Sequence, residues 1–113
     1  HLLVADLSFI SLRLAIPPVL PSLVPGAEAV LLVKPQFEAG RDDVGSGGIV
    51  RDAAVHRRVL VETWTFFAGT DLCPRALAMS PIKGGEGNTE FLMRLRLGGT
   101  PGDLGAALAG LEL

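Results

Sequence analysis

Two short apolar runs, residues 2–5 and 29–33, each end in a charged residue, Asp6 after the first and Lys34 after the second. Neither run alternates apolar with polar residues, so both are predicted to be buried strands of a parallel sheet. Ligands of such sheets bind at the edge where the carboxyl ends of the strands meet. Because neighbouring strands lie about 4.8 Å apart, we expect Asp6 and Lys34 to lie side by side at that edge.

The segment between the two runs has the signals of a helix. Ser8 is predicted to cap it, and Pro17, Pro18 and Pro21 are expected to kink or restart it. After Lys34, residues 35–48 are predicted to be a long loop, either a lid on the substrate side or a flexible surface loop.

A second helix, of about four turns, is predicted between Asp52, its cap, and Gly69, which ends it. Apolar residues recur along it at helical spacing, so one face should be buried and the other hydrated. The buried face should carry Val55, Val59, Leu60, Thr63, Trp64 and Phe67, and the hydrated face His56, Arg57, Arg58 and Glu62.

The last third of the chain contains two further strand patterns, residues 75–80 and 90–97, and a short helix pattern at 103–111. A short connection between adjacent strands favours an antiparallel pair. The order strand, helix, strand, helix and hairpin is that of the second half of a doubly wound sheet. We therefore expect an α/β fold in which parallel strands are followed by an antiparallel hairpin.

Composition narrows the class of function. No apolar stretch approaches the about 20 residues that a membrane-spanning helix needs. The net charge of −2 argues against bulk electrostatic binding of a nucleic acid. Cys73 is the single cysteine, which is compatible with the cytoplasm. His1 and His56 lack partners at metal-ligand spacing, so no metal site is expected.

The best candidates for catalytic residues are Asp6, Lys34 and Glu90. Glu90 opens the last strand, and its carboxylate could point to the same edge as Asp6 and Lys34. Position alone leaves other interpretations open. Asp6 and Lys34 could be a structural ion pair, or a helix-capping Asp and a surface Lys, and Glu90 could be a solvated strand-end acid. The sequence around Glu90 slightly favours the solvated acid.

Four segments together resemble one family. Residues 6–12 (DLSFISL), 33–40 (VKPQFEAG), 47–52 (GGIVRD) and 87–91 (GNTEF) resemble the TlyA-type, FtsJ-like ribosomal RNA 2′-O-methyltransferases, often labelled hemolysin A. The resemblance keeps order and spacing from residue 2 to about residue 97. It implies a partial Rossmann-like, class I methyltransferase fold with S-adenosylmethionine as methyl donor.

The resemblance also implies a Lys-Asp-Lys-Glu tetrad around a ribose hydroxyl, and Asp6, Lys34 and Glu90 match its last three members. Asp6 would also border the cofactor. The first lysine, the glycine-rich cofactor motif and an S4-like RNA-binding domain have no counterpart in residues 1–113. We therefore expect the chain to be the C-terminal half of the catalytic domain, a poor catalyst when isolated, and able to self-associate through the strand at residues 2–5.

The implied reaction is methylation of a ribose 2′-hydroxyl, of a cytidine in 16S or 23S rRNA, with ribosomal RNA or ribosomal subunits as partners in the cytoplasm. An interpretation from another class is a non-catalytic RNA-binding or ribosome-associated module of the same fold. Membrane lysis, which the hemolysin label suggests, ranks last because no segment has the length or amphipathic character of a pore former.

Overall fold

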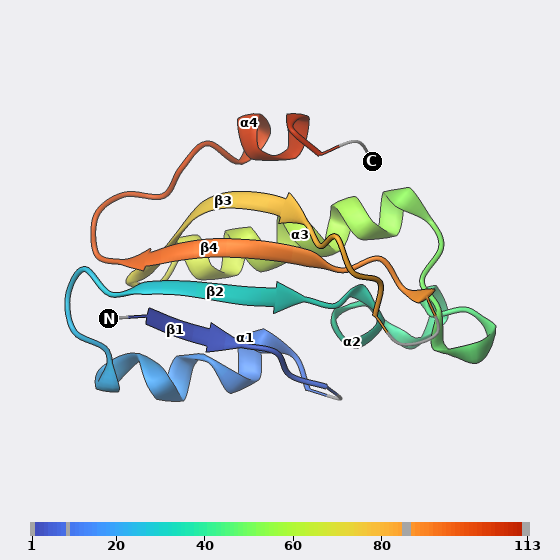
Figure 1. Cartoon of the computed structure of the whole chain (residues 1–113), viewed down its shortest axis with the longest axis horizontal. Coiled ribbons are helices and arrows are strands. Elements are labelled where there is room, and N and C mark those ends of the chain that lie inside the picture. Colours follow the sequence, from blue (N-terminus) through green and yellow to red (C-terminus); the bar gives the residue numbers. More distant parts are fainter. Residues whose placement is uncertain (1, 9, 85–86, 112–113) are drawn as a thin grey trace.

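A single mixed sheet organises the chain in the computed structural model, which describes residues 2–8, 10–84 and 87–111 (Figure 1). Its strands are β1 (Leu2–Ala5), β2 (Glu28–Val33), β3 (Leu72–Met79) and β4 (Phe91–Leu97), in the spatial order β1-β2-β4-β3. β1 pairs with β2 in parallel, whereas β4 is antiparallel to both β2 and β3. The prediction of parallel strands followed by an antiparallel hairpin is confirmed.

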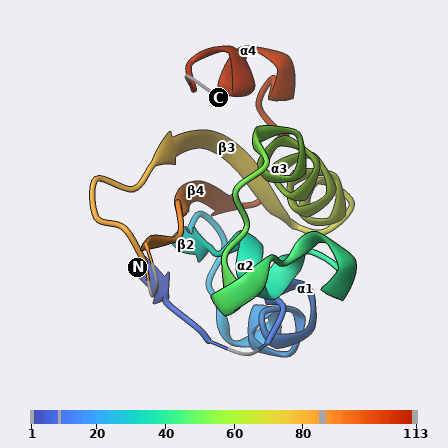
Figure 2. The same cartoon turned by 90° about the vertical axis from the view of Figure 1, so that its right-hand side faces the viewer.

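The helices lie mainly on one side of this sheet. They are α1 (Leu12–Ala15), α2 (Pro35–Glu38), α3 (Ala53–Ala68) and α4 (Leu104–Ala109), with 3₁₀ turns η1 (Pro17–Ser22), η2 (Arg41–Asp43) and η3 (Ser46–Gly48). Figure 2 shows α1, α2 and α3 on the same side of the sheet, while α4 packs beyond the edge at β3.

The core fills the space between the sheet and α3. Alternate residues of β2 and β4 point into it and are fully buried: Ala29, Leu31, Val33, Phe91, Met93 and Leu95. The predicted inward stripe of α3 meets them, and all six of its members are buried. Each fully buried large apolar side chain contributes about 1.5–3 kcal/mol, so this contact dominates the stability of the sheet.

The opposite face of the sheet is open among the described residues, which contradicts the prediction that the first two strands are buried on both faces. Val30 and Leu32 are only partly buried, and Leu2 and Val4 are 66% and 65% exposed. The two strands have apolar residues on both faces, but α1, α2 and α3 cover one face only. Among the described residues β1 pairs with β2 alone, which makes it an edge strand of this sheet.

The predicted cap at Ser8 is wrong, because Ser11 caps α1 and its hydroxyl accepts a hydrogen bond from the Arg13 amide at 3.1 Å. α1 is a single turn that leads into η1 at the predicted prolines. The predicted loop 35–48 also contains helical turns, and α2 begins with Pro35, a residue favoured at the first position of a helix.

α3 matches its prediction at both ends. The Asp52 carboxylate accepts from the Ala54 amide at 2.8 Å, and Gly69 forms the C-cap. Only His56 departs from the predicted pattern: it is buried, with its Nε2 2.8 Å from the Val50 carbonyl oxygen and its ring edge-on to Phe91. A local helical pattern cannot reveal partners that come from distant segments.

The C-terminal elements shift by a few residues from their predicted bounds. β3 starts at Leu72 and contains Pro74, next to a register shift against β4. Proline is tolerated there because β3 is an edge strand and the ladder is irregular at that point. α4 is shorter than predicted and is capped by Asp103.

Among the residues that the structure describes, no helix is long and apolar enough to cross a membrane. The same residues include no group of three or more His, Cys, Asp or Glu side chains that could hold a metal ion.

Candidate active site

Three adjacent strands bring Asp6, Lys34 and Glu90 to one cavity of about 410 Å³. Asp6 directly follows β1, Lys34 directly follows β2, and Glu90 directly precedes β4. Because β4 runs antiparallel to β2, its first residue lies at the edge where β2 ends. The lining residues are Asp6, Leu32, Lys34, Ser80, Ile82, Lys83, Gly84, Glu90 and Leu92.

Asp6 and Lys34 form an ion pair, with Lys34 Nζ 2.5 Å from Asp6 Oδ1. Lys34 Nζ also donates to Ser8 Oγ at 3.4 Å. The Lys34 side chain is only 13% exposed, whereas the Asp6 side chain is 63% exposed. The expected juxtaposition is therefore present, and it leaves the carboxylate accessible to a ligand while the ammonium is held in place.

Glu90 is 5% exposed, so the interpretation as a solvated strand-end acid is wrong. Its Oε2 accepts a hydrogen bond from Gln36 Nε2 at 2.8 Å, across 54 positions of sequence. A buried carboxylate needs such partners because desolvation of an unpaired charge is unfavourable. Glu90 thus has the burial and the fixed orientation of a site residue.

The segment before Glu90 is fixed by Asn88, which is 2% exposed. Asn88 Oδ1 accepts from the Val50 amide at 2.9 Å, and Nδ2 donates to the Gly48 carbonyl at 2.9 Å. These bonds tie residues 48–50, at the end of the predicted loop, to the segment that directly precedes β4. On the outer side of the loop, Arg58 of α3 donates to Asp43, and this hydrogen bond raises the pKa of Arg58. The loop is therefore anchored at Asp43 and at residues 48–50.

A buried carboxylate also joins the segments that follow Asp6 and Lys34. Glu38, at the end of α2, accepts from Ser11 Oγ at 2.6 Å and from the Leu12 amide at 2.7 Å. It satisfies donors at the start of α1 that would otherwise lack partners. Since α1 follows Asp6 and α2 follows Lys34, Glu38 holds the two sides of the ion pair in a fixed relation.

Sequence reasoning missed three residues of this site. Gln36 lies two positions after Lys34 in a segment predicted to be loop, and Gly84 lies in the loop between β3 and β4. Lys83 adds a second cation to the cavity, and its Nζ donates to Thr89 Oγ1 at 2.8 Å. Lys83 and Gly84 line the cavity, whereas Gln36 acts on it through its hydrogen bond to Glu90. All three lie near Lys34 or Glu90 in the sequence, but only the fold shows their contacts with the site.

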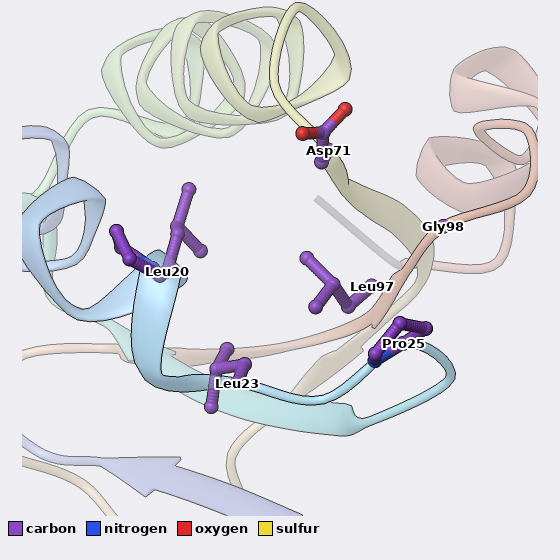
Figure 3. Close-up of a pocket in the computed structure, with 7 residues that line it drawn as sticks. Leu20, Leu23, Pro25, Asp71, Leu97 and Gly98 are labelled. Carbon is purple, nitrogen blue, oxygen red and sulfur yellow. The ribbon is translucent and has the colours of Figure 1, made fainter.

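A second hollow, of about 420 Å³, lies at the opposite edge of the sheet. Figure 3 shows Leu20, Leu23 and Leu97 around it, with Asp71 on its rim. Its lining contains no cation, thiol or hydroxyl side chain. It therefore lacks groups for the chemistry that the first cavity can support.

A family model and several known proteins match this chain. The sequence model of the FtsJ-like methyltransferase family matches residues 1–97. YqxC of Bacillus subtilis, provisionally named an rRNA methyltransferase, is 53% identical over 90 residues, which are 80% of this chain and 32% of that protein. The 16S/23S rRNA (cytidine-2′-O)-methyltransferase TlyA of Mycobacterium tuberculosis is 37% identical over 111 residues, which are 98% of this chain and 40% of that protein.

A similar fold has been solved. A provisionally named hemolysin from Streptococcus thermophilus superposes with a TM-score of 0.86 at 43% identity, over 91% of this chain and 38% of that one. This chain thus spans only 32–40% of the length of these three relatives.

Proposed function

Because this chain belongs to the FtsJ-like methyltransferase family, we propose that it forms the substrate side of an S-adenosylmethionine-dependent enzyme that methylates a ribose 2′-hydroxyl of ribosomal RNA. The methyltransferase family and the α/β fold that the four motifs implied are confirmed. The observation that carries the proposal is the meeting of Asp6, Lys34 and Glu90 in one cavity.

The cavity residues suit a reaction at a hydroxyl. A ribose hydroxyl is a poor nucleophile, so a positioned base or cation must remove or stabilise its proton as the oxygen reacts. Lys34 is the candidate, since Asp6 orients its ammonium at 2.5 Å. An ammonium held by a carboxylate can orient the hydroxyl and stabilise negative charge on its oxygen.

S-adenosylmethionine would supply an electrophilic methyl group on its sulfonium. The cofactor is cationic at that sulfur and at its amine, and the exposed Asp6 carboxylate, an acceptor at the binding edge of the sheet, fits such a ligand. Asp6 is therefore proposed to border the cofactor as well as to hold Lys34.

The RNA would be bound by residues at the cavity and not by the overall charge of the chain. With a net charge of −2, the chain offers no general attraction to phosphate, but Lys83 lines the same cavity as Lys34. A cytidine of 16S or 23S rRNA is the proposed target by analogy with TlyA, whose name states that substrate. Action on ribosomal RNA would take place in the cytoplasm.

We also propose that residues 1–113 act as the C-terminal half of the methyltransferase domain. The tetrad's first lysine and the glycine-rich cofactor motif have no match in this sequence. The isolated chain would consequently be a poor catalyst, and activity should be measured on the full-length protein.

Replacing Lys34 by Ala tests the proposal directly. In the full-length protein, K34A should lower the rate of rRNA methylation at least about 100-fold, the range typical of a lost proton-transfer or orienting group, while cofactor binding persists. Arg57→Ala, on the exposed face of α3, is the matched control and should leave the rate unchanged. Full methylation by K34A would overturn the assignment. RNA binding without cofactor binding in the wild type would instead favour a non-catalytic module.

A further inference from the structure

We propose that Gln36 and Gly84 are positioning residues that fix the Glu90 carboxylate in the cavity, Gln36 by a hydrogen bond and Gly84 by the absence of a side chain. The functional meaning of this arrangement rests on the proposed methyltransferase activity. The two residues come from different elements, α2 and the loop between β3 and β4, and they converge on one side chain.

Gln36 orients Glu90 by donating from its amide nitrogen. Nε2 lies 2.8 Å from Glu90 Oε2, and the reverse orientation of the amide would bring two acceptors together. The remaining Gln36 atom, Oε1, is buried without a hydrogen-bond partner among the described residues. An unpaired buried acceptor is unfavourable, and such exceptions in folded proteins call for an explanation. The bond to Glu90 supplies one.

Gly84 makes room for the same carboxylate. A Cβ atom on Gly84 would lie 1.8 Å from Glu90 Oε2 and 2.3 Å from its Cδ. The Gly84 backbone is fixed, because its amide donates to the Asn88 carbonyl at 2.8 Å and its carbonyl accepts from the Gly87 amide at 3.0 Å. Gly84 is not among the glycines with positive φ, so alanine would suit the backbone. The clash therefore falls on the Glu90 carboxylate.

Two substitutions should therefore displace the Glu90 side chain without replacing Glu90 itself. Gln36→Leu removes the donor and frees the carboxylate to turn. Gly84→Ala adds a methyl group that pushes it away from its place. Because the clashing atoms are the flexible end of a side chain, Gly84→Ala should displace Glu90 and leave the fold intact.

A double-mutant cycle on the full-length protein tests whether both residues act through Glu90. Each of Q36L and G84A should lower kcat for rRNA methylation at least tenfold, with the KM for S-adenosylmethionine unchanged. Combining either with Glu90→Gln should lower kcat no further than Glu90→Gln alone, because residues that act as a unit are not additive. Gly110→Ala, whose added Cβ meets nothing closer than 3.7 Å, is the glycine control and should keep full activity.

Additive losses in the double variants, or full activity of both single variants, would overturn the proposal. If G84A fails to fold, the shorter acid in Gly84→Ala/Glu90→Asp should restore folding, and a failure to restore it would count against the crowding of Glu90. The ¹³C shift of the Glu90 carboxyl group gives a readout that is independent of activity: it should change in Q36L and G84A. An unchanged shift refutes the positioning roles, whereas full methylation by Glu90→Gln with a changed shift refutes only the proposed function.

Discussion

Removal of the Glu38 carboxylate should destabilise the chain strongly, although Glu38 lies outside the apolar core. Its side chain is 2% exposed and accepts two short hydrogen bonds, from Ser11 Oγ and from the Leu12 amide. Hydrogen bonds to a charged group contribute about 1.5–3 kcal/mol each. Part of that gain is offset by the desolvation of the carboxylate. Glu38→Ala should therefore lower the free energy of unfolding by about 3 kcal/mol, and a shift of this size lowers Tm by about 10–15 °C in a domain of this length.

Urea unfolding followed by the fluorescence of Trp64, the single tryptophan and a buried residue of α3, would measure this loss. Glu38→Gln keeps one acceptor oxygen and the shape of the side chain, so it should lose only about 1 kcal/mol. Glu62 is a carboxylate of α3 with two ion pairs and 46% exposure. Glu62→Ala should change stability by no more than about 0.5 kcal/mol. If Glu38→Ala lost no more than Glu62→Ala, the argument from buried hydrogen bonds would be refuted.

Two further outcomes are expected. Val4→Lys places a charge on an exposed position of edge strand β1. In sedimentation velocity of residues 1–113, it should shift the chain from self-associated species to monomer. A wild-type chain that is already a stable monomer would contradict the role of this edge. Lys83→Ala in the full-length protein should weaken rRNA binding and reduce the slope of log Kd against log salt concentration by about one, the value for one lost phosphate contact. Lys83→Arg should preserve both the affinity and the slope. An unchanged slope in Lys83→Ala would show that Lys83 does not contact phosphate.

The sequence alone predicted the elements whose signals are local. α3 was placed within a residue at each end, because Asp52 and Gly69 mark its ends and a long apolar stripe marks its buried face. β1 and β2 were located by short apolar runs that end in charge. Asp6 and Lys34, the charged residues that end these runs, were predicted to lie at one edge, because the carboxyl ends of two parallel strands lie at the same edge of a sheet.

The errors occurred where a partner comes from far along the chain. The cap of α1 was placed at Ser8, but Glu38 of α2 fixes the start of this helix at Ser11 and Leu12. His56 was expected in water, but a carbonyl six residues earlier and the ring of Phe91 enclose it. The sequence slightly favoured a solvated acid at Glu90, because its partner Gln36 lies 54 positions away. A single sequence gives the kind of side chain at each position but not the contacts that bury it.

The position of β1 in the sheet determines which part of the site unfolds first. In the described part of the chain, β2 and β4 have hydrogen-bonded neighbours on both sides, whereas β1 has one on one side only. Local opening is easiest where backbone hydrogen bonds and buried contacts are few, so the amides of β1 should exchange with solvent faster than those of β2 and β4. Such an opening separates Asp6 from Lys34 while β2 and β4 stay paired. When residues 1–113 are warmed, the ion pair at the cavity should therefore be lost before the core melts.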